Sequence, residues 1–200
     1  MAFIAAVALC PIVIILSPTR AATTAAASIF TGSVIALFGT SAAYHRFDWG
    51  PKMSTVMQRL DHSMIFIAIA ATYTPFAVAA LEPGPSTLIL TVVWTGAVLG
   101  VISRLAWPTA PRSLMAGLYA LVGWSCLLVI DDLWHSLSTA AFVLLVAGGA
   151  LHTFGAVIYA TKRPDPWPRV FGFHEVFHVC TIAAIACHYA AAAIFTIPMG

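Results

Sequence analysis

Charged side chains are scarce in this chain. Asp, Glu, Lys and Arg together make up 8% of its 200 residues, whereas 61% of the residues are hydrophobic. About a quarter of the residues of a typical soluble domain are charged, so this composition excludes an ordinary soluble protein. The few basic residues also exclude the concentrated positive surface that nucleic-acid binding requires, and we expect no nucleic-acid partner.

Paired cysteines, glycine-rich phosphate loops and internal repeats are absent as well. The four cysteines fall inside apolar segments and form no C-x-x-C pair. We therefore expect neither a disulfide nor a thiolate metal site. The cysteines concerned are Cys10, Cys126, Cys180 and Cys187.

Long apolar runs are what the sequence has instead. A helix that crosses the hydrocarbon core of a bilayer, about 30 Å thick, needs about 20 predominantly apolar residues. The first run lacks the basic start and small-residue cleavage site of a signal peptide, so it too is interpreted as a span. We predict an all-α integral membrane protein, one seven-helix domain over residues 1–200, with spans near 2–17, 24–43, 60–81, 86–103, 113–130, 137–160 and 172–196.

Basic residues are distributed unevenly between the predicted loops. Loops rich in Lys and Arg stay on the cytoplasmic side of a membrane. The sequence therefore predicts a cytoplasmic N-terminus, an outside C-terminus and a multi-pass protein of the cell membrane, specifically the bacterial inner membrane. Eight of the nine basic residues lie in or beside the second, fourth and sixth loops: Arg46, Lys52, Arg59, Arg104, Arg112, Lys162, Arg163 and Arg169.

Ionisable residues gather where three predicted helices meet the cytoplasmic face. Ser41 and His45 close the second helix, and His174 and His178 open the seventh. Members of each pair are four residues apart, so each pair projects from one helical face. Asp61 stands at the predicted start of the third helix. The two pairs and the carboxylate can therefore converge at one depth.

Such a cluster suits zinc. Neutral imidazoles bind zinc well, and three protein ligands leave the fourth tetrahedral position to water. In this hypothesis His45, His174 and His178 hold the metal. Asp61 lies beside the water and takes its proton as a general base, and Ser41 holds a substrate carbonyl.

Structural roles could explain the same residues. A membrane histidine can serve only to bond to a neighbouring helix, and Ser41 could bond back to the carbonyl four residues earlier. Asp61 could cap the start of its helix. His174-Glu175-x-x-His178 also matches the H-E-x-x-H pattern of zinc proteases, but Glu175 is turned about 100° from the histidine stripe. No soluble lobe is present to hold a peptide.

The other polar residues of the spans are interpreted as packing or cavity residues. His62 adjoins the cluster but points elsewhere, and His152 lies within an apolar span. His188 is ten residues beyond His178, about 15 Å along a helix, too far to bind the same ion. Three neighbouring polar residues could line a lipid-sized cavity that leads to the metal: Thr72, Tyr73 and Thr74.

Taken together, these motifs resemble those of the hemolysin III proteins, which belong with the progestin and adipoQ receptors. The resemblance covers nearly the whole chain. It rests on Ser41-x-x-x-His45, on residues 60–66 (LDHSMIF) running to residues 71–75 (ATYTP), and on His174-Glu175-x-Phe177-His178 followed by His188-Tyr189.

This resemblance implies a seven-helix bundle with one zinc ion near the cytoplasmic face. Its ligands would be His45, His174 and His178, with Asp61 contacting the water on the metal. It also implies kinship with alkaline ceramidases, which hydrolyse lipid amides. The chain departs from the family in Ala71, where bacterial members often have glycine, and in lacking a basic stretch before the first helix, so the true start could lie upstream of Met1.

Three functions are consistent with these residues. The first is a zinc-dependent hydrolase of lipid amides or esters that acts in membrane lipid homeostasis, with a membrane lipid as its substrate. The second is a metal-stabilised membrane receptor or homeostasis factor without turnover. The third is a haemolytic pore, although no polar stripe repeats along several spans as a pore lining would require. Nothing in the sequence indicates an oligomeric state.

Overall fold

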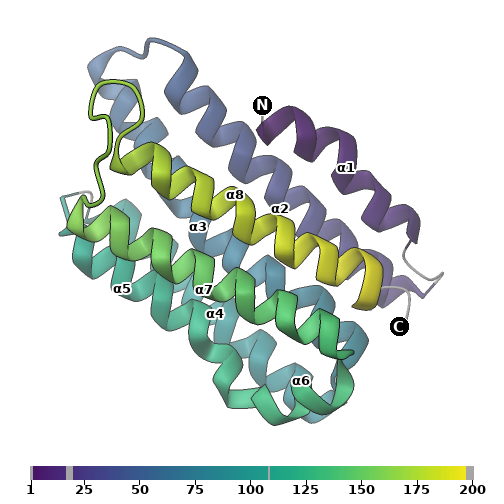
Figure 1. The fold of residues 1–200 in the computed structure, drawn as a ribbon. Helices are drawn as coiled ribbons and strands as arrows, with labels where there is room; N and C mark the ends of the chain where they lie inside the picture. The colour runs from purple at the N-terminus through teal and green to yellow at the C-terminus, as the bar shows by residue number, and fades with distance from the viewer. Residues whose placement is uncertain (1, 17–19, 108, 197–200) are drawn as a thin grey trace.

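Helices form the regular structure of this protein, and a computed structural model describes residues 2–16, 20–107 and 109–196. Outside the helices, the described residues contain one isolated bridge, between Trp167 and Phe171. In chain order the helices are α1 (Ala2–Leu16), α2 (Ala21–Arg46), α3 (Pro51–Ala80), α4 (Pro83–Ala106), α5 (Arg112–Gly123), a 3₁₀ helix η1 (Trp124–Val129), α6 (Ile130–Ser136), α7 (Thr139–Thr161), α8 (Phe173–Ala190) and a π-helical end η2 (Ala191–Thr196) (Figure 1).

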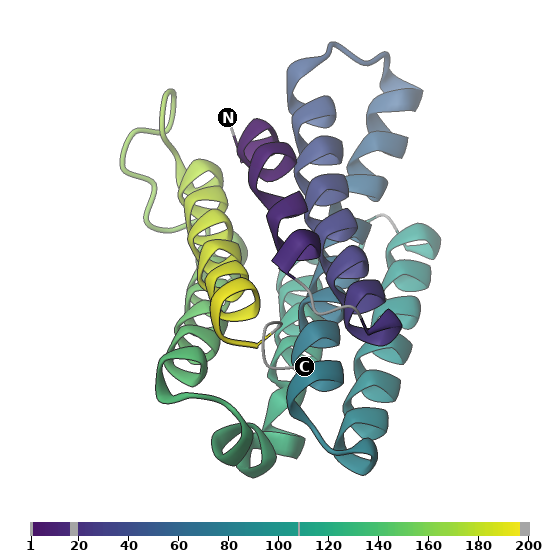
Figure 2. The ribbon, with the colours of Figure 1, turned by 90° about the vertical axis from the view of Figure 1, so that its right-hand side faces the viewer.

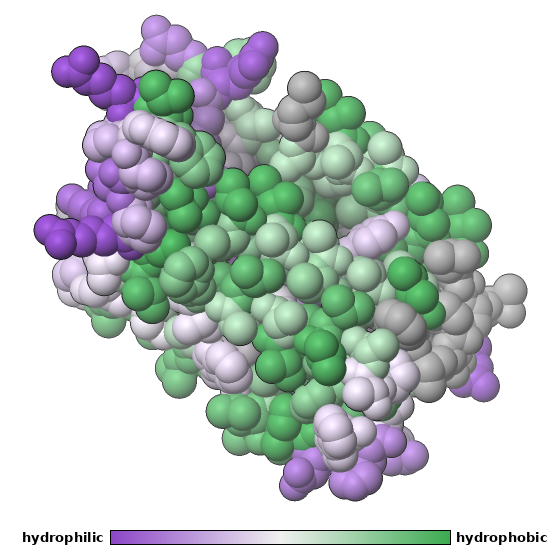
Figure 3. Space-filling view, in the orientation of Figure 1, coloured by the Kyte–Doolittle hydropathy of each residue, from purple (hydrophilic) through white to green (hydrophobic). Residues whose placement is uncertain are grey.

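Six helical segments of the described chain are long and apolar enough to cross a membrane. They are α2, α3, α4, Arg112–Ser136, α7 and Phe173–Ile194, and the shorter α1 is apolar throughout. Green, hydrophobic side chains cover the middle of the face in Figure 3, and purple, hydrophilic ones gather towards its ends. The predicted all-α membrane protein is therefore confirmed, while the seventh crossing and the sidedness stay predictions.

The helices pack as two groups joined by α5. In the first group α3 packs against α2 and α4, and α1 packs on α2. In the second group α8 pairs with α7, and Figure 2 shows this pair standing apart from α2 and α3. Because α5 contacts α3, α4 and α7, it links the groups. The apposed helices leave the interior space in which the site lies.

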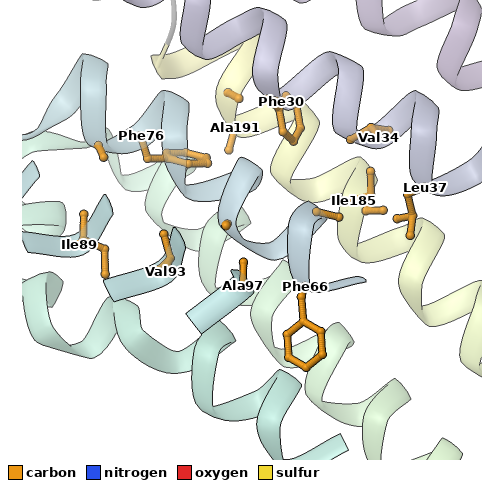
Figure 4. Close-up of a cluster of buried hydrophobic side chains, with 14 of the residues drawn as sticks. Phe30, Val34, Leu37, Phe66, Phe76, Ile89, Val93, Ala97, Ile185 and Ala191 are labelled. Carbon is orange, nitrogen blue, oxygen red and sulfur yellow. The ribbon is translucent and has the colours of Figure 1, made fainter. Parts of the chain in front are cut away.

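A core of apolar side chains holds the first group together. Phe30 of α2 and Phe66 of α3 have no exposed surface, and Val93 of α4 is likewise fully buried (Figure 4). Gly100 lets α4 approach α3, because a Cβ at this position would collide with the ring of Phe66. Small residues bring membrane helices close in this way.

Helix α3 begins nine residues earlier than the sequence predicted. The predicted span started at residue 60, but the helix starts at Pro51. Proline is well suited to the first position of a helix, since its fixed φ is helical and its missing N–H would be unpaired there anyway. The polar first turns of α3 escaped the hydropathy pattern. Asp61 consequently lies in the third turn of α3, and its interpretation as a helix cap is wrong.

The predicted span 113–130 is in fact broken. Helix α5 ends at Gly123, η1 follows, and α6 extends the segment to Ser136, so the predicted loop containing Asp131 and Asp132 is helical. The Tyr73 hydroxyl donates to the Gly123 carbonyl and accepts from the N–H of Cys126 at 3.1 Å. These bonds satisfy backbone groups that the break leaves unpaired, as the interior of a membrane requires.

The basic residues meet at one end of the bundle, where α2, α4 and α7 end and α3, α5 and α8 begin. We call this the histidine end, since His45 and His174 lie there. Eight of the nine Lys and Arg residues occur at or near these helix ends and their connections, and Arg20 lies at the opposite end. The charge asymmetry predicted from the sequence is thus present in three dimensions.

Candidate metal centre

Three helices bring the predicted site residues to the histidine end. Ser41 and His45 lie in the last two turns of α2, and Asp61 faces them from α3. His174 and His178 occupy the first turns of α8. The predicted i, i+4 pairs therefore project from helix ends, where their side chains meet at one level of the bundle.

Hydrogen bonds fix the start of α8 and with it the register of its histidines. The Glu175 carboxylate accepts from the N–H of Gly172 at 2.8 Å, and the Asp165 carboxylate accepts from the N–H of Phe173 at 2.9 Å. Both bonds satisfy donors at a helix N-terminus. The exposed Glu175 therefore has a capping contact, which accounts for it without the role of a protease base.

The three predicted ligand imidazoles converge. Nε2 of His174 lies 3.4 Å from Nε2 of His45 and 3.1 Å from Nε2 of His178. Ring centroids are 4.5 Å apart for His174 and His178, and 5.4 Å apart for His45 and His178. One ligand nitrogen from each residue lies within 4.8 Å of the other two, so the group could hold a metal ion.

Two of the three nitrogen separations fit tetrahedral coordination. With Zn–N bonds of about 2.0–2.1 Å, two tetrahedral ligand nitrogens lie about 3.3–3.4 Å apart. The measured separations of 3.1 and 3.4 Å are close to this spacing. Imidazole nitrogens are also ligands that zinc prefers. The residues present therefore fit the ion that the sequence hypothesis assigned to them.

A buried carboxylate accompanies the triad. Asp61 is 9% exposed and lines the same pocket as His45 and His174. The hydroxyl of Ser41 donates a hydrogen bond to its carboxylate, and His45 is close enough to act on it electrostatically. The structure thus brings together every residue of the predicted site.

Sequence reasoning missed three further residues around this pocket. His62 was expected to point away, but it lines the pocket together with Tyr159 and Arg112. Nε2 of His62 is hydrogen-bonded to the Tyr159 hydroxyl at 3.1 Å, and Nδ1 lies 3.1 Å from a guanidinium nitrogen of the buried Arg104. Only their shared position at one end of the bundle could have signalled these contacts.

A second pocket extends from the same residues into the bundle. His62 and Tyr159 line both pockets, and the second one continues between α3, α5, α7 and α8. Its empty space is about 1550 Å³, the opening included, and its walls are mainly apolar. We call it the apolar cavity.

The polar residues expected around a lipid-sized cavity are partly confirmed. Thr72 and Tyr73 line the apolar cavity, as do His152 and His188. Thr74 does not, because its hydroxyl accepts from the indole N–H of Trp94 at 3.3 Å between α3 and α4. All four cysteines are free, as the sequence predicted.

Comparisons with known proteins agree with this architecture. A family model described as Haemolysin-III related matches residues 1–189. The Hemolysin-3 homolog of Bacillus subtilis (strain 168) is 28% identical over 162 residues, which cover 81% of this chain and 73% of that protein. Hemolysin-3 of Bacillus cereus is 27% identical over 190 residues, 94% and 84% of the two chains. The Adiponectin receptor protein of Drosophila melanogaster is 27% identical over 180 residues, 81% and 40% of the two chains.

Proposed function

This chain belongs to the haemolysin-III related family of membrane proteins, and from that premise we propose that it is a zinc-dependent hydrolase of lipid amides or esters. His45, His174 and His178 hold the zinc ion in this proposal. The reaction serves membrane lipid homeostasis, as the sequence hypothesis stated.

One observation carries the proposal. Two histidines of the triad, His45 and His174, line a pocket together with a buried carboxylate, and that pocket shares His62 and Tyr159 with the apolar cavity. A purely structural metal site requires neither a further carboxylate beside its ligands nor an apolar space next to it. A hydrolase of lipids requires both, because the acyl chain must be held while a proton is moved.

The chain's own residues have distinct tasks in this mechanism. When bound, zinc supplies a Lewis acid that polarises a carbonyl and makes water more acidic. The Asp61 carboxylate accepts the proton of the attacking water and later returns it to the leaving group. Ser41 orients this carboxylate through its hydrogen bond. The apolar cavity binds the acyl chain and keeps bulk water away from it.

The basic residues support the proposed orientation. Since they gather at the histidine end, we place that end in the cytoplasm, with the N-terminus inside and the C-terminus outside. Helix α1 supplies the seventh crossing, held by the bond from the Thr31 hydroxyl to the Cys10 carbonyl at 3.2 Å. The membrane concerned is the bacterial inner membrane.

A metal-stabilised receptor or homeostasis factor without turnover is the second candidate. It is favoured by the packing of α8, which lies mainly on α7 and η2 and hardly touches α2. A metal ion held by His45 of α2 and by His174 and His178 of α8 would tie the two helix groups together. Stability alone would be reason enough for such a link.

Asp61→Asn separates the two candidates. We expect purified protein in lipid nanodiscs to contain about one zinc ion per chain and to release fatty acid from N-acyl or ester lipids. Because the amide cannot accept a proton, Asp61→Asn should lower the turnover rate by about 10²–10⁴-fold while the zinc content stays unchanged. Released fatty acid and elemental zinc are the measurements.

His135→Ala is the matched control, since this exposed histidine lies in α6 at the opposite end of the bundle. It should change neither the turnover rate nor the zinc content. Wild-type protein that binds zinc but releases no fatty acid from either lipid class would support the non-catalytic candidate. An Asp61→Asn variant with wild-type turnover would overturn the mechanism.

A further inference from the structure

A second histidine pair lies deep in the apolar cavity. His152 of α7 and His188 of α8 both line it, with ring centroids 5.6 Å apart and planes inclined by 35°. His188 follows His178 by ten residues, which places it about 15 Å further along α8. That distance is about half of the ~30 Å hydrocarbon core. The pair therefore lies near the middle of the membrane.

The protonation of His188 follows from one contact. Its Nε2 lies 3.2 Å from the carbonyl oxygen of Leu145. A carbonyl only accepts, so Nε2 carries the proton, and Nδ1 of the neutral ring is an acceptor. Nδ1 is buried and has no hydrogen-bond partner among the described residues. A buried acceptor left in this state costs free energy unless a donor reaches it.

His152 is also without a hydrogen bond within the described part of the chain, although it lies against the same cavity. Its neutral ring offers one donor and one acceptor. No hydrogen bond holds this ring in place, so it can turn and open the way to Nδ1 of His188. Packing between α7 and α8 explains the Leu145 contact but neither of these unpaired imidazole groups.

The backbone of α7 makes room for His188. A Cβ on Gly148 would collide with the imidazole of His188, whereas a Cβ on the next residue, Gly149, would meet no atom within 4 Å. Helix α7 therefore has a glycine at the position where the His188 ring leaves no space for a Cβ atom. Polar groups at this depth are costly in a membrane and usually serve a function.

We propose that His152 and His188 form a polar subsite that binds a hydroxyl group in the chain of a lipid held in the apolar cavity. A hydroxyl donates to Nδ1 of His188 and accepts from the ring N–H of His152. A carboxylate could not do this, because it has no proton to give to Nδ1. Two imidazoles alone also fall short of the three protein ligands typical of a zinc site.

This inference rests on the proposed function, since it specifies the substrate class of the same cavity. The substrate is a lipid with a reactive carbonyl at the metal centre and a hydroxyl about 15 Å away along its chain. The acyl chain between the two groups passes His62 and Tyr159, which line both pockets. Chains without the hydroxyl leave the acceptor on His188 unpaired and bind more weakly.

Ricinoleate and oleate test the subsite directly, because they differ by one hydroxyl beyond the middle of the chain. We would measure equilibrium binding of both radiolabelled fatty acids to the full-length protein in nanodiscs, with empty nanodiscs subtracted. Wild-type protein should favour ricinoleate by about tenfold, the equivalent of one or two neutral hydrogen bonds. His152→Phe should abolish this preference while oleate binding changes less than twofold.

Two glycine variants form the matched pair. Gly148→Ala displaces the ring of His188 and should also abolish the preference, although neither imidazole is removed. Gly149→Ala adds the same methyl group to the same helix beside the same cavity, and it should keep the preference. This pair keeps the test valid if His152→Phe folds poorly.

The outcomes separate this inference from the proposed function. Equal binding of ricinoleate and oleate by wild-type protein, or a preference that persists in His152→Phe and Gly148→Ala, overturns the subsite. A ricinoleate preference that depends on both residues supports the subsite even if no lipid is hydrolysed, since binding is measured without turnover. Hydrolysis of lipids with no hydroxyl preference would uphold the proposed function and overturn the subsite.

Discussion

Helix α8 has histidines in two contrasting surroundings. At its start His174 and His178 face a third imidazole from α2, with Nε2 separations of 3.1 and 3.4 Å. Near its end His188 has His152 as its imidazole neighbour, and its buried Nδ1 has no hydrogen-bond partner among the described residues. The first group could hold a metal ion, whereas in the second group no donor of the described residues reaches Nδ1 of His188. One residue type therefore lies in different chemical surroundings at the two ends of α8.

The connection between the two regions is as informative as the difference. His62 and Tyr159, hydrogen-bonded at 3.1 Å, line both the pocket that contains His45, His174 and Asp61 and the apolar cavity. A polar pair at this boundary separates a space that suits an ion from one that suits a hydrocarbon chain. The following predictions test this division of roles, beginning with the largest effect.

His45→Ala should produce the largest change, because His45 is the ligand that α2 contributes. We expect the zinc content to fall to near zero. In this variant, added zinc should no longer raise the unfolding temperature. In the wild-type protein, zinc at a free concentration 100-fold above its Kd should raise the free energy of unfolding by about 2.7 kcal/mol. Thermal unfolding with and without a chelator measures this. A variant that keeps its zinc would disprove the triad.

Tyr159→Phe should have an intermediate effect. Without the hydroxyl, Nε2 of His62 loses its partner, which should lower the free energy of unfolding by about 1 kcal/mol and leave the zinc content unchanged. Tyr44→Phe is the control, since Tyr44 lines the same pocket but its hydroxyl forms no hydrogen bond within the described residues. Equal effects of the two changes would show that the His62 contact is unimportant.

His188→Leu should have the smallest effect on stability. The change removes the bond to Leu145 and also a buried acceptor without a partner, two contributions of opposite sign. We expect the free energy of unfolding to change by less than about 1 kcal/mol, with normal zinc content. A loss as large as that of His45→Ala would instead mean that the deep pair is structural, and the contrast between the two regions would disappear.

Much of the metal centre could be predicted because its residues repeat at helical spacing. Ser41 and His45, like His174 and His178, are four apart, so any helix places each pair on one face. Asp61 was found because it is a carboxylate in an apolar segment. The predicted position of Asp61 at the start of its helix was wrong, because the polar turns from Pro51 onward do not follow the hydropathy pattern.

Other features depend on helices that are far apart in the sequence. His62 and Tyr159 are 97 residues apart, and nothing local predicts their hydrogen bond. The break between α5 and α6 likewise depends on Tyr73, which is 50 residues from the carbonyl that it satisfies. Such contacts follow from how the helices are arranged, which hydropathy does not determine.

By itself the sequence determined the helical class, the membrane setting, the uneven distribution of basic residues and the candidate ligands, because apolar length, charge and i, i+4 spacing are local properties. Only the tertiary structure decided that the ligand nitrogens of three histidines lie within 4.8 Å of one another. It alone placed the apolar cavity beside that site and left Nδ1 of His188 without a hydrogen-bond partner among the described residues. The physical reason is that a site joining separate helices depends on their packing, which local patterns do not specify.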